Sequence, residues 1–390
     1  MTTAAPARAP ERALARWRVP LAAWAVSRLL VMAAAVAASL AFGVPTRGVD
    51  PAVPGALTQI GGWDTTWYLD VARNGYAHDV GQVGDVFTNL AFFPLMPGIM
   101  ALFLAIGVNP FVGALVVSNL AFLGALAGLH SLTATRMGDA AAARATWVLA
   151  LAPPALYCSL AYTEAIALAC AVGAALCAVR GRYALAGLIA AVAALTRPTG
   201  ILVALLVGLL ALSAPAPGRV RRIAVGVLPS IAAVGAFLVW MALARGSALL
   251  PLEAQRAWDR GQLGLGLVTA APREIAAGWR LVVEGNLTAA WHATARDVGF
   301  LVAYLWLLVR LWRSEGGLRS PWVGYSLAAI AIPVSSGTVT SMARFGLLAF
   351  PLAWPMAEWL AADRRRVPRA AAVAVALTLL MVAQLTMRSP

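Results

Sequence analysis

The sequence predicts an all-α protein that crosses a membrane about eleven times as one domain spanning residues 1–390. Of its 390 residues, 61% are hydrophobic and only 12% are charged. Soluble domains are about 45–50% apolar, so this chain has more apolar side chains than a water-soluble fold needs. The apolar residues also fall into separate runs, and the sequence contains no evident repeat or linker that would divide it into smaller units.

Twelve apolar runs are candidates for spanning helices, which need roughly 17–25 apolar residues each. Three of them, 145–160, 183–196 and 198–213, are short, and we expect these helices to be tilted or broken. In chain order the runs are 19–43, 91–107, 111–134, 145–160, 161–179, 183–196, 198–213, 223–244, 297–313, 320–334, 344–361 and 369–387.

Arginine positions indicate which of these runs cross the membrane. All 30 basic residues are arginine, and most lie in short clusters between apolar runs. If 91–107 does not span, every strong cluster falls on the side of the N-terminus, as the positive-inside rule requires. That run contains two prolines. We therefore expect it to lie on or dip into the outer face, which leaves about eleven spans.

The N-terminal segment predicts the orientation. Residues 1–18 are basic, and the apolar run that follows is longer than the ~7–15-residue apolar core of a signal peptide. We expect a cytoplasmic tail, a retained signal anchor and a multi-pass protein of the cell membrane. The clustering of arginine between the runs explains the net charge of +14 by topology and makes nucleic acid an improbable partner.

Polar residues then converge on the extracytoplasmic side. Two long loops, 44–110 and 245–296, are expected there, with shorter turns at 162–164, 196–200 and 335–344. The second loop carries PLEAQRAWDRG (251–261), an amphipathic piece that could cover a binding site or be a surface helix.

The most unusual stretch is GGWDTTWYLDVARNGY, at 61–76. If Trp63–Tyr76 is a helix, Asp64 shares a face with Tyr68, and Trp63 shares one with Trp67. Aromatic residues are common where lipid meets water, so an interfacial belt with an incidental carboxylate is the alternative to a binding site.

This stretch, followed by NLAFFPLMP at 89–97, resembles the signature of the PIG-V-like mannosyltransferases, which are GT-C glycosyltransferases related to the enzyme that adds the second mannose to GPI anchors. LYCSLAYTEA (156–165), LTRPTG (195–200) and MARFGLLAFPL (342–352) resemble further segments of that family. The chain departs at Phe87, where eukaryotic members tend to have a glutamate, although Asp85 is close by.

The resemblance implies a GT-C fold whose first outer loop bears interfacial helices. It also implies a polyprenyl-phosphate-mannose donor and an acceptor that is a glycolipid, a lipid-linked glycan or a protein. Asp64 would be the general base that takes the acceptor's hydroxyl proton in an inverting transfer. The substrate-binding candidates are Trp63, Trp67, Tyr68, Tyr162, Glu164 and Asn89.

The leaving phosphate needs cations, and arginine can bind it with two parallel hydrogen bonds. Arg28 is a candidate because an intramembrane charge is costly and often functional. Arg197 and Arg344 are candidates because they lie on the side that the positive-inside rule leaves poor in arginine. For Arg28 the structural alternative is snorkelling or an ion pair with a buried acid. For Arg197 and Arg344 it is an ion pair with Glu164 or an outer aspartate.

Two further points stay open on sequence alone. His78, Asp79 and Glu164 could contribute to a divalent metal site, but their spacing matches no known ligand pattern, and we expect no obligatory cofactor. The same fold could use another polyprenyl-phosphate sugar. A lipid or solute transporter is the alternative from a different class, although transporters usually show paired halves and charges near the midplane.

Overall fold

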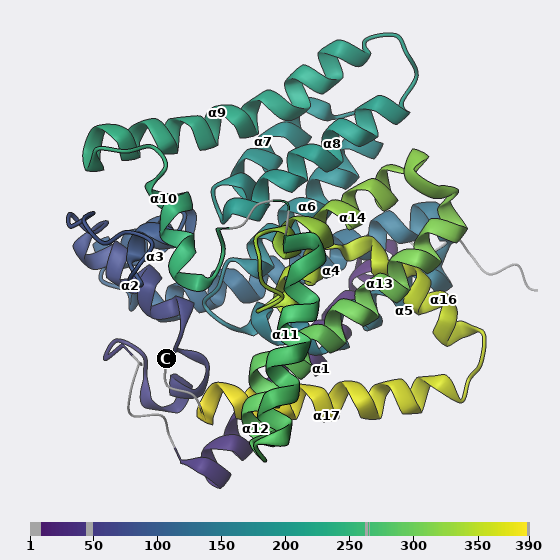
Figure 1. The fold of residues 1–390 in the computed structure, drawn as a ribbon. Helices are drawn as coiled ribbons and strands as arrows, with labels where there is room; N and C mark the ends of the chain where they lie inside the picture. The colour runs from purple at the N-terminus through teal and green to yellow at the C-terminus, as the bar shows by residue number, and fades with distance from the viewer. Residues whose placement is uncertain (1–8, 44–49, 262–263, 265, 388–390) are drawn as a thin grey trace, which may run out of the picture.

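The computed structural model describes residues 9–43, 50–261, 264 and 266–387, and these form helices joined by turns (Figure 1). Within these ranges there is no β-strand, as expected for an all-α fold. The first residues of the expected tail, 1–8, and of the first expected loop, 44–49, lie outside them. The α-helices are α1 (Ala9–Phe42), α2 (Asp64–Asn74), α3 (Leu95–Ala105), α4 (Pro110–Met137), α5 (Asp139–Leu151), α6 (Glu164–Val179), α7 (Tyr183–Ala194), α8 (Leu202–Ser213), α9 (Arg219–Arg245), α10 (Leu250–Glu253), α11 (Gly266–Val283), α12 (Leu287–Ala290), α13 (Arg296–Glu315), α14 (Pro321–Ser335), α15 (Met342–Phe345), α16 (Ala353–Ala361) and α17 (Arg366–Met387).

Short turns of tighter or wider helix connect these elements. The 3-10 turns are η1 (Gly55–Ile60), η2 (Asn89–Ala91), η3 (Pro153–Ser159), η4 (Pro198–Ile201), η5 (Ala254–Trp258), η7 (Gly317–Arg319), η8 (Gly346–Leu348) and η9 (Phe350–Leu352). A π-turn, η6 (Trp291–Ala295), leads into α13.

Four helices in the described part of the chain are long and apolar enough to cross a membrane: Trp17–Phe42, Pro110–Met137, Arg219–Arg245 and Arg366–Leu385. The pair η3 and α6 adds a fifth if it is counted as one bent span. Large apolar side chains on these helices, such as Leu243, are exposed on the protein surface, which suits contact with lipid. The chain is therefore a membrane protein, and the larger number of eleven spans remains a prediction.

Several expected spans are broken where proline interrupts the helical hydrogen bonds. The run 145–160 contains α5, which ends at Leu151, and η3, which begins at Pro153 and meets α6 at an angle of 104°. The run 344–361 is divided among α15, η8, η9 and α16. The run 91–107 forms only the 11-residue α3, which is too short to cross a bilayer upright.

Small residues allow the helices to pack closely, as is common in membrane proteins. At the α7–α9 contact, a Cβ added to Gly187 would lie 2.2 Å from the carbonyl oxygen of Val225. In Figure 1, α7, α8 and α9 run side by side, and the turns α8–α9, α13–α14 and α16–α17 lie at one end of the molecule. Helices α2, α3 and α10 lie toward the other end.

Candidate functional site

A cavity of about 420 Å³ is bounded by α2, η2, the α7–α8 turn, the α10–η5 segment and the turn between α14 and α15. This volume lies within the range of about 300–1,000 Å³ that is usual for small-molecule sites. Its walls are mostly apolar, with rings such as Phe92 and Phe345. The charged side chains that line it are Asp64, Arg197, Glu253, Arg256, Arg260 and Arg344.

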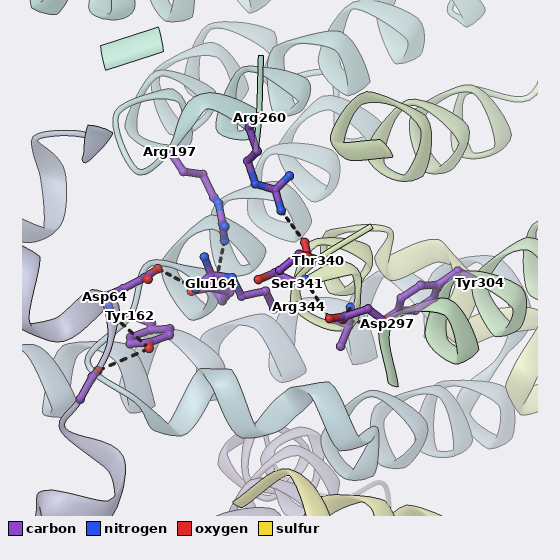
Figure 2. Close-up of polar contacts among 12 residues, drawn as sticks. Asp64, Tyr162, Glu164, Arg197, Arg260, Asp297, Tyr304, Thr340, Ser341 and Arg344 are labelled. Carbon is purple, nitrogen blue, oxygen red and sulfur yellow. Dashed lines mark hydrogen bonds and ion pairs between the residues drawn. The ribbon is translucent and has the colours of Figure 1, made fainter. Parts of the chain in front are cut away.

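Asp64 and Arg344, which are 280 positions apart in sequence, form an ion pair at the cavity wall. Nη1 of Arg344 donates to a carboxylate oxygen of Asp64 at 2.6 Å. Asp64 is the first residue of α2, where the helix dipole favours a negative charge. The hydroxyl of Tyr162 accepts a hydrogen bond from the Asp64 amide at 3.2 Å and donates to the carbonyl of Gly62 at 3.4 Å. The start of α2 is therefore held against the break before α6 (Figure 2).

Glu164 joins two of the predicted arginines beneath this pair. It is the first residue of α6, and it is buried. Its Oε1 accepts from Nη1 of Arg197 at 2.6 Å and lies 3.5 Å from Nε of Arg344. Asp64, Glu164, Arg197 and Arg344 are thus one connected cluster, and the ion pairs expected as the structural alternative for Arg197 and Arg344 are present.

Gly200 allows the α7–α8 turn to present Arg197 to the cluster. A Cβ at this position would lie 1.9 Å from the carbonyl oxygen of Ala193, so no larger residue fits without moving the backbone. The Gly in the LTRPTG segment is therefore explained by close packing of the turn.

Three guanidinium groups surround the ring of Phe345. The Cζ atoms of Arg260, Arg197 and Arg344 lie 4.5, 4.6 and 5.3 Å from its centroid. Cations are attracted to aromatic faces at these distances, which offsets part of the repulsion between like charges. Arg260 was not among the residues predicted from sequence.

Asp297 holds the segment that carries Arg344, and it too was not predicted. Its buried carboxylate accepts the amides of Ser341 at 3.0 Å and Ala343 at 2.9 Å, and it pairs with Arg296 at 2.5 Å. Tyr304 donates its hydroxyl proton to the carbonyl of Ala343 at 2.8 Å. Figure 2 shows Asp297 and Tyr304 beside the segment that carries Ser341 and Arg344. Asp297 and Tyr304 therefore act on the site through the backbone of the 341–343 segment.

Backbone strain also marks the site. In the described ranges, three non-glycine residues have positive φ: Trp63 (62°), Asp259 (58°) and Ser341 (66°). Trp63 and Asp259 directly precede Asp64 and Arg260, and Ser341 begins the turn that carries Arg344. Such conformations cost about 1–3 kcal/mol each and cluster at functional sites.

Tyr68 lines the cavity one helical turn after Asp64, as the predicted helix implied. Burial, followed by the negative charges of Asp64 and Glu164, raises the pKa of Tyr68 above its usual range. The phenol therefore stays protonated and can donate a hydrogen bond to a ligand.

The other predicted aromatic and polar residues lie behind the wall. Trp63 precedes α2, so it does not share a helical face with Trp67 as expected. Trp67 packs against Phe92, with ring centroids 5.9 Å apart. Asn89 donates to Asp70 at 2.6 Å and accepts from the amide of Ala77 at 2.8 Å, which fixes the chain leading to the cavity.

Arg28 lies apart from the cluster and does not line the cavity. It is buried in α1, where its Nη2 donates to the carbonyl of Ala155 at 3.1 Å. Its guanidinium lies 4.4 Å from the ring centroid of Phe122. Ala155 belongs to η3, so Arg28 satisfies backbone that the break after α5 leaves unpaired, which is how irregular backbone is tolerated in membranes.

This placement predicts that Arg28→Gln leaves the affinity of the cavity for its ligand unchanged, because the side chain does not line the cavity. Its effect should instead be a lower melting temperature, since the Ala155 carbonyl loses a charged donor. Ligand titration and thermal unfolding of the purified variant measure the two quantities. An affinity lowered as far as in Arg344→Gln would contradict this placement.

No protein-family model and no curated protein matches the chain. Its fold is similar to the crystal structure of the oligosaccharyltransferase of Archaeoglobus fulgidus in complex with Zn and sulfate, with a TM-score of 0.51 and 12% identity. The similarity covers 93% of this chain and 53% of that one, so this chain spans about half of the length of the matched structure. The chain therefore shares its fold with about half of an oligosaccharyltransferase.

The cavity residues do not suit a resident metal ion. Within the described ranges, no three His, Cys, Asp or Glu side chains come together as metal ligands. Asp64 and Glu164, the carboxylates of the cluster, are already bound by guanidinium groups, and His78 and Asp79 do not line the cavity. Neighbouring arginine charges would also oppose a divalent cation there.

Proposed function

We propose that this protein is a membrane glycosyltransferase that moves a mannosyl residue from polyprenyl-phosphate mannose to a hydroxyl group of an extracytoplasmic acceptor. The observation that carries the proposal is the ion pair of Asp64 and Arg344 at the wall of the cavity. A base for the attacking alcohol and a cation for the leaving phosphate are the two groups that such a transfer needs. The similar fold of an oligosaccharyltransferase and the first-loop resemblance to PIG-V-like enzymes support it.

The proposed reaction is a single displacement in which Asp64 is the base and the polyprenyl phosphate is the leaving group. The acceptor oxygen attacks C1 of the sugar from the face opposite the phosphate, and the C1–O bond to the phosphate breaks. Asp64 takes the hydroxyl proton, and the polyprenyl phosphate leaves with the electron pair. Inversion at C1 follows from this single displacement. General-base help of this kind typically contributes about 10²–10⁴-fold.

Glu164 and Tyr68 prepare the site for this step. Glu164 accepts a hydrogen bond from Arg197 and lies within ion-pair distance of Arg344, so it helps to orient both guanidinium groups before the phosphate arrives. Groups fixed in advance stabilise charge without reorganising during the reaction. Tyr68, protonated and directed into the cavity wall beside Asp64, can donate to a sugar hydroxyl.

We assign the cavity to the extracytoplasmic side. The turns α8–α9, α13–α14 and α16–α17, which carry arginine clusters, lie at one end of the molecule, and α2 and α10 lie toward the other (Figure 1). The positive-inside rule places arginine-rich turns in the cytoplasm. A lipid-linked sugar suits a cavity on the extracytoplasmic side, because its polyprenyl chain keeps the donor in the membrane beside the cavity.

Purified protein in lipid nanodiscs, supplied with radiolabelled polyprenyl-phosphate mannose and acceptors from a membrane extract, tests the proposal. We expect a mannosylated product that forms in EDTA as well as without it, because the cluster is built from arginine–carboxylate pairs. Parallel reactions with polyprenyl-phosphate glucose and arabinose measure the sugar preference. If the protein transfers no sugar but moves the donor across the bilayer of liposomes, the proposal is contradicted and a transporter is indicated.

A further inference from the structure

The cluster at Phe345 contains one cation more than its paired carboxylates can balance. Arg344 pairs with Asp64, and Arg197 pairs with Glu164. Arg260, the third guanidinium at this ring, forms no ion pair with a described residue. Its hydrogen bonds go to neutral oxygens: Nη1 donates to the hydroxyl of Ser336 at 3.2 Å, and Nη2 donates to the carbonyl of Thr340.

The surroundings of Arg260 favour an incoming anion. Burial, followed by the like charges of Arg344 and Arg197, lowers the pKa of Arg260 to about 9. A lowered pKa means that the protonated side chain is destabilised here. An anion in the cavity would remove this penalty, because it would supply the opposite charge that the protein does not.

Arg260 is also held toward the cavity by backbone on both sides. Asp259, with φ of 58°, turns the chain at the end of η5, and the amide of Gly261 donates to the carbonyl of Ser336 at 3.0 Å. Earlier in the same segment, the side chain of Gln255 donates to the carbonyl of Ala91 at 2.8 Å. Figure 2 shows Arg260 and Arg197 reaching toward the Arg344–Glu164 pair.

We propose that Arg260 is the main anchor of the donor's phosphate, a role that the sequence motifs had suggested for Arg28, Arg197 and Arg344. The inference rests on the proposed function and names the part of the site that binds the lipid phosphate. Arg197 and Arg344 then make secondary contributions at the phosphate, because their charges are already paired with Glu164 and Asp64. Arg28 has no part in phosphate binding, because it lies outside the cavity.

The charge of the phosphate changes during the reaction in a way that suits this arrangement. A donor phosphodiester carries one negative charge, which the one unpaired guanidinium of the cluster balances. After the C1–O bond breaks, the leaving phosphate monoester carries about −1.5 to −2 at pH 7. Arg260 therefore binds the leaving group more strongly than the donor, which lowers the barrier as well as KM.

The test measures binding of undecaprenyl phosphate, which carries no sugar, to the purified full-length protein in nanodiscs. We expect Arg260→Gln to weaken binding by roughly 10- to 100-fold, the usual effect of removing a charge-assisted contact. Arg260→Lys should fall between this variant and the wild type, because it keeps the charge but loses the two-pronged geometry.

Two control variants separate binding of the phosphate by Arg260 from the structural role of its hydrogen bonds and from the general positive charge of the cavity. Ser336→Ala removes a hydrogen bond of Arg260 without removing its charge. Arg256→Gln removes another cavity-lining arginine, which is exposed and lies outside the group at Phe345. Both should change affinity by no more than about threefold, as expected for substitutions away from a key contact. Melting temperatures show whether Arg260→Gln is folded.

The outcomes distinguish this inference from the proposed function. If the wild type transfers mannose and Arg260→Gln binds undecaprenyl phosphate as tightly as the wild type, the anchor is elsewhere and the function stands. If binding depends on Arg260 but no sugar is transferred, the phosphate site stands and the proposed reaction is wrong. Equal losses in Arg256→Gln and Arg260→Gln would show a diffuse charge effect and overturn the assignment of one anchor.

Discussion

Asp64→Asn should abolish measurable sugar transfer, with kcat lower by about 10²–10⁴-fold, the range that a general base contributes. The substitution keeps the shape of the side chain and an oxygen that can accept from Arg344. It removes the basicity needed to take a proton from the acceptor hydroxyl. Donor binding should persist, because the variant leaves Arg260 intact and reduces the negative charge near the phosphate.

The measurement is initial-rate transfer with saturating donor, beside the melting temperature and the donor Kd. Asp79→Asn is the matched control: it is the same chemical change in the same expected outer segment, and Asp79 does not line the cavity. Its activity should equal that of the wild type. Transfer by Asp64→Asn at more than a tenth of the wild-type rate would exclude Asp64 as the base.

The sequence predicted Asp64 from the aromatic motif of the first outer loop, and Glu164, Arg197 and Arg344 because they lie at the outer ends of apolar runs. Charged residues at the outer ends of apolar runs are unusual, so they are candidates for a functional site. Ion pairs of Arg197 and Arg344 with Glu164 or an outer aspartate were the structural alternative, but the partner of each could not be predicted. That choice depends on the 104° bend before α6 and on how α15 approaches α2. Those features are set by tertiary packing, which cannot be predicted from the pattern of apolar residues along the chain.

Arg260 was missed because the criterion that singled out Arg197 and Arg344 fails in a long loop. Several arginines are spread through 245–296, so no single one stands out there as an exception to the positive-inside bias. Five arginines besides Arg260 occur in that segment, and none is distinguished by spacing alone: Arg245, Arg256, Arg273, Arg280 and Arg296.

Asp297 could have been noticed, since it begins an apolar run and an acid in such a place is expensive. Its function depends on two backbone amides 44 and 46 residues away, which no sequence pattern reports. The number of spans was uncertain for a related reason. Hydropathy detects apolar length, but the prolines of 145–160 and the glycine and proline of 344–361 divide such runs into short elements.

Asp297→Asn should lower kcat by about 100-fold, the scale expected when a reacting group is displaced by about 1 Å. The carboxylate accepts two amides of the segment that begins α15, and an asparagine amide group would face one of those donors with a donor of its own. The segment must shift, and Arg344 moves with it, away from Asp64. Arg296 also loses its ionic partner.

A destabilised protein would also lose some activity, so the experiment must separate a loss of folded protein from a displacement of Arg344. The melting temperature should fall, since an unsatisfied buried polar group costs about 1–3 kcal/mol. The kinetic effect should exceed what the folded fraction explains. In a double-mutant cycle, Asp297→Asn combined with Arg344→Gln should be little worse than Arg344→Gln alone, because both changes remove the same contribution.

Tyr304→Phe is the comparison within the same segment. It removes one neutral hydrogen bond to Ala343, worth about 0.5–1.5 kcal/mol, and leaves both amides on Asp297. Its kcat should fall much less than that of Asp297→Asn. Additive losses in the double-mutant cycle would show that Asp297 supports the fold independently of Arg344. Non-additive losses would mean that a buried carboxylate, outside the cavity and not in contact with the substrate, sets the position of the arginine that orients the base.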